Sequence, residues 1–127
     1  MRIIGILSVL GLALIGQAHA NNSVGGDIAA GEKVFKQCKA CHVAHEAKNK
    51  TGPHLLGILG RPAGSLESYT RYSEAMKDSG LIWDEETLDG YLKNPKKYLK
   101  GTKMVYRGLK RDEDRHNVIA YLKSFSN

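Results

Sequence analysis

Apolar side chains near the start of the chain recur at helical spacing. They fall three or four positions apart, at Ile28, Gly31, Phe35 and Cys38. This spacing places them on one face of an α-helix with 3.6 residues per turn. Asp27 precedes them and is a residue type that caps helix N-termini. The pattern predicts a first helix that begins after Asp27 and carries the cysteines at its C-terminal end.

Three more helices are predicted further along. A short helix over 73–79 is stopped by Gly80, because glycine suits the left-handed position just beyond a helix end. The next helix is capped by Asp84 and ends before Pro95, because a residue that precedes proline avoids the helical conformation. The last helix begins near Asp112 and carries an apolar face. That face comprises Val118, Tyr121, Leu122 and Phe125.

The remaining stretches show neither the spacing of an amphipathic helix nor the alternation of a β-strand. Residues 43–68 are punctuated by glycine and proline, which predicts a long loop. Such a loop in a compact domain is usually functional, and a cofactor would give it something to wrap around. Residues 96–103 are basic and predict a loop or a single turn. Because no useful stretch alternates as a β-strand does, the expected fold class is all-α.

The N-terminus has the features of a secretory signal peptide. Arg2 is followed by an apolar run over 3–15, and the residues 18–20 read Ala-His-Ala, a small-x-small cleavage site. A helix that spans a bilayer needs about 17–25 apolar residues, more than this run offers. An uncleaved anchor is the alternative. We expect residues 1–20 to be removed, leaving 21–127 as a single domain in the bacterial periplasm.

The net charge of the chain indicates which kinds of partner it can bind. The formal net charge is +6, of which one unit belongs to the leader. A basic surface on a small domain suits acidic partners. Nucleic acid is not expected, because the compartment is wrong and no recognition helix or binding fold is visible in the sequence.

The most informative motif is the run Cys38-Lys39-Ala40-Cys41-His42. This C-x-x-C-H spacing is that of c-type haem attachment. Two thiols a turn apart can add across the two vinyl groups of one porphyrin, and the adjacent imidazole can bind the iron. The motif therefore predicts one covalently attached haem c.

Three other interpretations of the motif compete with this one. A redox-active C-x-x-C pair is expected in a βαβ context, which the sequence lacks. A zinc site needs a second ligand pair, and neither another C-x-x-C nor an H-x-x-x-H is present. A plain structural disulfide would make His42 a coincidence.

The sixth ligand of such an iron decides its function. A methionine raises the reduction potential and suits an electron carrier, whereas an open position permits ligand binding or oxygen chemistry. Met104 lies in a loop between two predicted helices, while Met76 lies in a short helix where core filling is the simpler role. Three histidines are rivals that we expect at surface or loop positions: His45, His54 and His116.

Several stretches in order along the chain are similar to a known family. They cover nearly all of 21–127, at residues 31–35, 38–42, 50–53, 60–61, 80–83, 91–98, 101–104 and 119–123. Together they resemble class I cytochrome c of the mitochondrial-like type found in bacteria. The resemblance implies three to five helices wrapped around one covalently bound haem, with the first and last helices crossing. Gly31 and Phe35 resemble one side of that crossing, and Val118 and Tyr121 the other.

The resemblance also implies roles for individual residues. Cys38 and Cys41 would form the thioethers, and His42 and Met104 would bind the iron. The carbonyl oxygen of Pro53 resembles the acceptor that orients the proximal histidine ring.

Further residues resemble groups that surround the haem in the family. Tyr91 resembles the tyrosine near the methionine sulfur. Arg61, Tyr72 and Trp83 resemble the groups that neutralise or hydrogen-bond the buried propionates, which would be costly to bury without partners.

The chain departs from the mitochondrial pattern at several positions. Lys100 replaces a proline that would stiffen the methionine loop, so the loop is expected to open more readily. Tyr106 replaces phenylalanine and adds a hydroxyl near the haem edge. Asn49 stands where many relatives have histidine, and His54 where asparagine is usual. Met76 falls where the family has a polar residue.

The resemblance implies a monomeric electron carrier rather than an enzyme. The expected partners are acidic surfaces of a cytochrome bc complex and a terminal oxidase, with a photosynthetic reaction centre or a periplasmic dehydrogenase as alternatives. The lysines expected to surround the haem edge are Lys33, Lys36, Lys39, Lys96, Lys97, Lys100 and Lys103. A haem peroxidase or small-gas-binding protein, in which Met104 leaves the iron, is the competing hypothesis.

Overall fold

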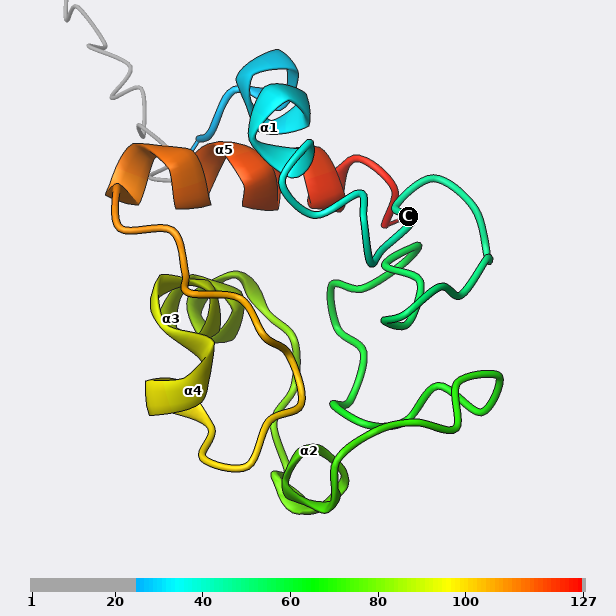
Figure 1. The fold of residues 1–127 in the computed structure, drawn as a ribbon. Coiled ribbons are helices and arrows are strands. Elements are labelled where there is room, and N and C mark those ends of the chain that lie inside the picture. The colour runs from blue at the N-terminus through cyan, green and yellow to red at the C-terminus, as the bar shows by residue number, and fades with distance from the viewer. Residues whose placement is uncertain (1–24, 127) are drawn as a thin grey trace, which may run out of the picture.

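The computed structural model describes residues 25–126, so the predicted leader at 1–20 lies outside the described residues. The described part contains α-helices and no strand, only an isolated bridge between Pro62 and Ile82. The helices are α1 (Ile28–Phe35), α2 (Glu74–Asp78), α3 (Glu85–Lys93), α4 (Pro95–Tyr98) and α5 (Asp112–Lys123). The all-α prediction is therefore confirmed (Figure 1).

Three of the predicted helix starts are made by local capping bonds. The carboxylate of Asp27 accepts a hydrogen bond from the amide of Ala30 at 2.6 Å. Ser73 caps α2 and Asp84 caps α3 in the same way, with bonds of 3.0 and 2.7 Å to the amide three residues on. Each cap satisfies an amide that has no partner within its helix. Gly80, just beyond α2, has the left-handed φ of +68° that the sequence predicts.

The helix boundaries differ from the prediction around the cysteines. α1 ends at Phe35, so Cys38 lies in the turns that follow rather than on the helix. The backbone tightens here, because the amides of Lys36, Gln37 and Cys38 each bond to a carbonyl three residues back. At the other end α5 stops at Lys123, before Phe125. Within the basic stretch, Asn94 caps the single turn α4.

The crossing of α1 and α5 holds the two ends of the domain together. The side chain of Asn117 on α5 accepts a hydrogen bond from the amide of Asp27 at 2.8 Å. The rings of Phe35 and Tyr121 pack with their centroids 5.3 Å apart. Gly31 lies directly against the backbone of Asn117. Figure 1 shows α1 lying across α5, as the resemblance implies.

A buried arginine joins α5 to the rest of the molecule. Arg115 is 2% exposed, and its Nε donates to Asp89 of α3 at 2.7 Å. Its Nη1 donates to the carbonyl oxygens of Leu109 and Lys110, and its Nη2 to Asp112. The guanidinium thereby fixes α3 and the segment that leads into α5 around one charge.

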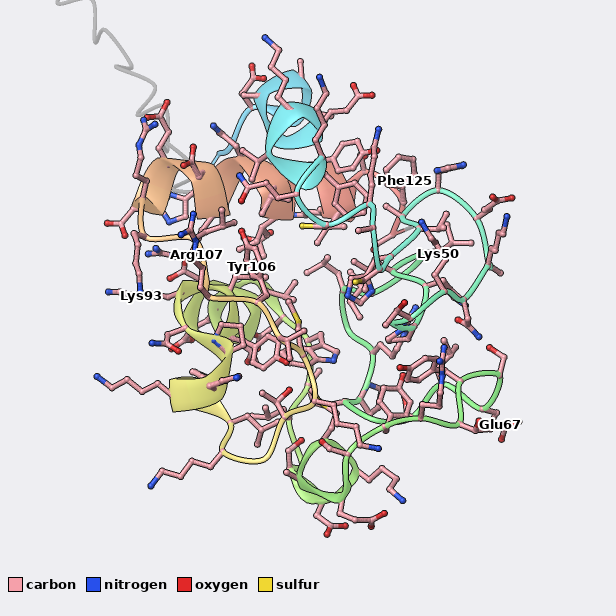
Figure 2. The ribbon with its side chains drawn as sticks, in the orientation of Figure 1. Lys50, Glu67, Lys93, Tyr106, Arg107 and Phe125 are labelled. Carbon is pink, nitrogen blue, oxygen red and sulfur yellow. The ribbon has the colours of Figure 1, made fainter. Side chains whose placement is uncertain are left out.

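The two helical layers and the long loop enclose the interior. α1 and α5 form one layer, α2, α3 and α4 lie opposite, and the loop over 43–72 closes the remaining side (Figure 1). Figure 2 shows Tyr106 near the centre of the molecule, whereas Lys93 and Glu67 lie at its periphery. None of the helices in residues 25–126 is both long and apolar enough to cross a membrane.

Candidate functional site

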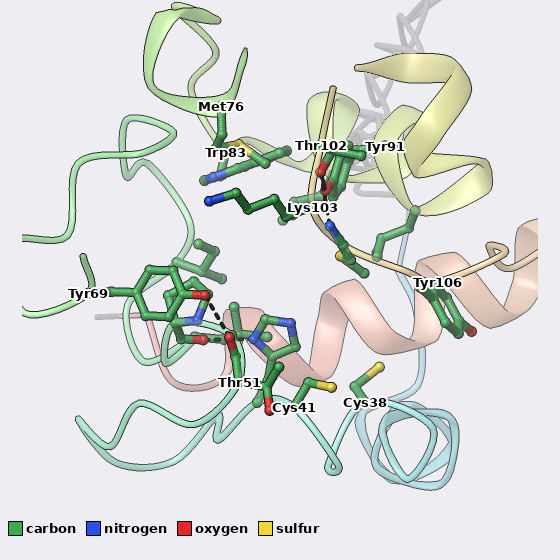
Figure 3. Close-up of a pocket in the computed structure, with 18 of the residues that line it drawn as sticks. Cys38, Cys41, Thr51, Tyr69, Met76, Trp83, Tyr91, Thr102, Lys103 and Tyr106 are labelled. Atoms are coloured by element: carbon green, nitrogen blue, oxygen red, sulfur yellow. Dashed lines mark hydrogen bonds between the residues drawn. The ribbon is translucent and has the colours of Figure 1, made fainter. Parts of the chain in front are cut away.

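A cavity of about 530 Å³ lies between these layers, and its walls are mainly apolar. Every site residue predicted from the sequence lines it: Cys38, Cys41, His42, Pro53, Arg61, Tyr72, Trp83, Tyr91 and Met104. Figure 3 shows the two cysteines and Thr51 on one side, with Thr102, Lys103 and Trp83 on the other. The fold thus brings residues from distant parts of the chain to one cavity.

The cysteine segment forms a tight turn on the wall of the cavity. The amides of Cys41 and His42 both donate to the carbonyl oxygen of Cys38, at 3.1 and 2.9 Å. Neither thiol is in a disulfide. Burial raises the pKa of the Cys38 thiol to about 11, and the nearby Cys41 adds to the effect. Cys38 is therefore a protonated thiol at neutral pH.

The ring of His42 is held by the loop opposite it. Its Nδ1 lies 2.7 Å from the carbonyl oxygen of Pro53. A carbonyl can only accept, so Nδ1 carries the proton and Nε2 keeps its lone pair. Burial lowers the pKa of His42, the bond to Pro53 opposes this, and Lys50 lowers it further. The ring is thus held neutral, the form in which histidine binds a metal.

Backbone pairing explains why Pro53 lies opposite His42. The amide of Gly52 donates to the carbonyl of Cys41 at 2.9 Å, and that of Leu55 to Val43 at 2.8 Å. Gly52 itself packs against the imidazole, because a Cβ there would lie 2.3 Å from the Cε1 of His42. The loop can approach the ring this closely only with glycine at this position.

The opposite wall is aromatic and carries Met104. Trp83 is 7% exposed, and its ring centroid lies 5.0 Å from that of Tyr91. The hydroxyls of Tyr91 and Thr102 share a hydrogen bond of 2.7 Å. Burial raises the pKa of Tyr91, and the bond to Thr102 partly offsets this. The Thr102 oxygen also accepts a long bond of 3.4 Å from the amide of Met104.

Met76 lies at the same cavity as Met104. It extends from α2, packs against the core and appears beside Trp83 in Figure 3. Met76 thus packs against the core, as predicted, and also lines the cavity. Both methionines of the described chain therefore line the cavity.

One end of the cavity is cationic. Arg61 donates to the carbonyl oxygens of His54 and Leu56, at 2.8 and 2.6 Å. Burial lowers its pKa, and Tyr72 opposes this shift. Arg71 and Lys103 also line the cavity, whereas none of its described lining residues is Asp or Glu. This end is suited to buried carboxylates, which need cationic or hydrogen-bonding partners.

The three rival histidines do not line the cavity. His45 is exposed, and His116 lies on α5 at 3.9 Å from Asp89. His54 was expected at a surface or loop position and is in a loop, but it is 8% exposed. Its Nδ1 is the buried side-chain atom of the described residues that lacks a hydrogen-bond partner. His42 is thus the histidine that the described cavity wall presents.

Sequence reasoning missed several cavity residues. The sequence places Gly52 in the predicted loop and Thr102 in a stretch that resembles the family, and it assigns neither residue a role of its own. Arg71 and Tyr69 also line the cavity, where the Tyr69 hydroxyl donates to the carbonyl of Thr51 at 2.6 Å. Tyr69 and Arg71 both lie shortly before Tyr72 in the sequence. Their nearness to this predicted site residue was the available signal that they line the cavity.

The residues present fit a haem c. The cavity offers a pair of free thiols, an oriented neutral imidazole, thioethers and an apolar wall. Its cationic end suits the two propionates. Two thiols at this spacing beside an imidazole are the groups that hold a c-type haem.

Comparison with known proteins finds similarity to cytochromes c in both sequence and structure. The family model described as "Cytochrome c" matches residues 28–126. A cytochrome c2 from Rhodomicrobium vannielii is 50% identical over 117 residues, which cover 91% of both chains. A cytochrome c-554 from Methylosinus trichosporium is 52% identical over 101 residues, covering 79% of this chain and 76% of that one. The structure of cytochrome cH from Methylobacterium extorquens matches with a TM-score of 0.74 and 46% identity, covering 78% of this chain and 99% of that one.

Proposed function

The chain belongs to the class I cytochrome c family, and from this membership we propose that it carries single electrons with a haem held by His42 and Met104. Cytochromes c hold haem c covalently, and Cys38 and Cys41 have the spacing for its two thioethers. The chain is thus an electron-transfer haem protein. The proposal concerns its ligands, its partners and its compartment.

The observation that carries the proposal is the bond between His42 and Pro53. It fixes the tautomer and the ring orientation, and it raises the basicity of the imidazole. Met104 lines the same cavity beside the Tyr91–Thr102 pair. An imidazole with a thioether is the ligand pair of high-potential electron carriers.

The surrounding residues suit electron transfer without a substrate. When bound, the haem supplies one-electron redox chemistry. The apolar wall excludes water and disfavours additional charge, which raises the reduction potential. Arg61, Tyr72 and Trp83 would hold the propionates at the cationic end. Because the ligands remain in place, the chain needs no substrate pocket and acts as a carrier rather than an enzyme.

The basic surface supports the proposed choice of partner. The seven lysines that flank the cysteines and Met104 in sequence are all exposed. Within the described residues none of them forms an ion pair with a carboxylate. Such charges steer a protein toward acidic surfaces and raise its association rate. We propose membrane redox complexes as partners, among them a cytochrome bc complex and a terminal oxidase.

The compartment follows from the sequence at the N-terminus. We propose that residues 1–20 direct export and are removed, and that 21–127 functions as one monomeric domain in the periplasm. N-terminal sequencing of the purified holoprotein tests the cleavage. A mature chain that retains the apolar run over 3–15 would contradict it.

The ligand assignment is tested by replacing each cavity methionine in turn. A ferric iron bound to methionine gives a near-infrared charge-transfer band at neutral pH. We expect Met104→Ala to abolish this band and to lower the reduction potential. Met76→Ala is the matched control, because Met76 lines the same cavity from α2 and should leave the band in place.

The competing function predicts a different result from the unmodified protein. If the band is absent at neutral pH, and cyanide or carbon monoxide binds rapidly, the iron has an open site. The chain would then be a peroxidase or a gas-binding protein. If Met76→Ala removes the band and Met104→Ala does not, Met76 is the ligand.

A further inference from the structure

The segment that carries Met104 has few bonds to the rest of the protein. In the described chain, no backbone–backbone hydrogen bond involves residues 103–108. The segment is anchored at its ends instead. Thr102 donates its amide to Leu99 at 3.1 Å, and the amide of Leu109 donates to Leu92 at 2.8 Å. Within the described chain, residues 103–108 therefore connect two anchored ends without a backbone–backbone hydrogen bond of their own.

Glycines flank this segment at both anchors. Gly101 has a φ of +90° and Gly108 a φ of +104°, values that other residues rarely adopt. A Cβ at Gly108 would lie 2.2 Å from the carbonyl oxygen of Lys93. Lys100 precedes the first glycine and does not restrict the backbone as proline would. Both ends of the segment thus have a backbone conformation that depends on glycine, and Gly108 packs tightly against the end of α3.

One short hydrogen bond ties the middle of this segment across the cavity wall. The hydroxyl of Tyr106 donates to the side-chain oxygen of Gln37 at 2.8 Å, between residues 69 positions apart. Both residues line the cavity. The other bonds that leave the segment are longer. Lys103 donates to the carbonyls of Arg71 and Tyr72 at 3.4 and 3.5 Å, and the amide of Met104 donates to the Thr102 hydroxyl at 3.4 Å. The tyrosine bond is thus the strongest of these connections.

Gln37 is a rigid attachment point for this bond. Its amide donates to the carbonyl of Val34, and the next amide, of Cys38, donates to Phe35. Phe35 packs on Tyr121 of α5, so Gln37 is fixed to the crossing of α1 and α5. The bond therefore joins the segment of Met104 to the turn that follows α1, next to Cys38.

The position of Tyr106 couples this bond to Met104. Along the extended segment, Met104 and Tyr106 are half-buried while Val105 and Arg107 are exposed. In an extended chain alternate side chains share a face, so Met104 and Tyr106 turn toward the protein together. Figure 2 places Tyr106 at the centre of the molecule, and Figure 3 places it on the side of the cavity near Cys38.

We propose that the Tyr106–Gln37 hydrogen bond holds residues 103–108 closed and sets how readily Met104 leaves the iron. The hydroxyl of Tyr106 and the amide of Gln37 are positioning groups, which act on ligation through the segment and not by touching the iron. This inference rests on the proposed ligation by Met104.

Two variants and a double variant test the proposal on the ferric holoprotein. Tyr106→Phe removes only the hydroxyl, and Gln37→Leu removes its acceptor. Tyr98→Phe is the matched control, because Tyr98 is exposed and its hydroxyl has no hydrogen bond to the described residues. Loss of one such bond should raise the open population about two- to tenfold. The readouts are hydrogen exchange at the amides of Met104 and Leu109, which are hydrogen-bonded to Thr102 and Leu92, and the rate of cyanide binding at neutral pH.

We expect both single variants to exchange and to bind cyanide faster by the same factor. The double variant should show no further increase, because either change alone removes the bond. Unchanged exchange at the amides of Met104 and Leu109, or an equal effect of Tyr98→Phe, would overturn the proposal. Faster exchange with an unchanged cyanide rate would overturn the link to Met104.

The exchange measurement keeps this inference separate from the proposed ligation. If the near-infrared band is absent from the unmodified protein, the ligation by Met104 fails. Exchange at the amides of Met104 and Leu109 still reports on the closure of the segment in that case. A band that is present together with unchanged exchange would show the opposite result, with ligation correct and the inference wrong.

Discussion

A Cβ atom at Gly31 of α1 would lie 1.9 Å from the carbonyl oxygen of Asn117 of α5. The two helices therefore touch backbone to backbone, and no side chain can be placed between them. The next contact along the crossing is aromatic, between Phe35 and Tyr121. The glycine sets the separation of the helices, and the rings fill the space beside it.

Gly31→Ala should destabilise the holoprotein strongly. The methyl group must push α1 away from α5, and overpacking of this kind costs about 3 kcal/mol. Denaturant titration measures the loss. Gly57→Ala is the control, because a Cβ at Gly57 meets open space and costs only about 1 kcal/mol for its φ of +68°. Equal losses in the two variants would show that the crossing tolerates the methyl group.

Arg115→Gln should lower the free energy of unfolding by about 2–3 kcal/mol. The change removes the charge that holds Asp89 and leaves the carbonyl oxygens of Leu109 and Lys110 without their donor. Chemical denaturation at neutral pH checks the value. Arg111→Gln, at a side chain 70% exposed, should cost less than about 1 kcal/mol. A loss in Arg115→Gln as small as this would mean that water replaces the guanidinium.

Tyr91→Phe should cost about 1 kcal/mol, because it removes the hydroxyl bonded to Thr102. Thr102→Val should cost a similar amount by removing the partner. The double variant should lose less than the sum of the two, since both changes break the same bond. Thermal or denaturant unfolding of all three variants gives the coupling. Strict additivity would indicate that the two hydroxyls do not interact in solution.

His54 makes the stability of the protein depend on pH. Burial lowers its pKa below the ordinary value of 6.5, and Arg61 lowers it further. As the pH falls below about 6.5, His54 therefore takes up a proton in the unfolded chain while it stays neutral in the folded chain. Stability from the neutral ring is present above that pH and is lost below it.

His54→Asn tests this dependence without altering the rest of the loop. We expect the free energy of unfolding to fall less between pH 7 and pH 5 in the variant than in the unmodified protein. Denaturant titrations at the two pH values measure the difference, and the other titrating groups are common to both proteins. Identical falls would show that His54 is protonated equally in the folded and unfolded states.

The sequence by itself determined the features that act within about one helical turn. Asp27 and Asp84 were readable as caps because each bonds to an amide three residues away. Ser73 was predicted only as the first residue of a helix, and it caps α2 in the same way. The C-x-x-C-H motif was readable because its chemistry needs only adjacent residues. The stretches that resemble the family added the expectation that Met104, Arg61, Tyr72 and Trp83 lie around one cofactor, and the structure shows that all four line one cavity.

The tertiary structure decided what depends on residues far apart in the chain. No local sequence pattern predicts three of these features. They are the end of α1 before Cys38, the close packing of Gly52 on His42, and the burial of His54. The hydrogen bond of Tyr106 to Gln37 joins residues 69 positions apart, and the sequence showed only an added hydroxyl. Local bonds are fixed by neighbouring residues, whereas these contacts form only when the packed core brings the segments together.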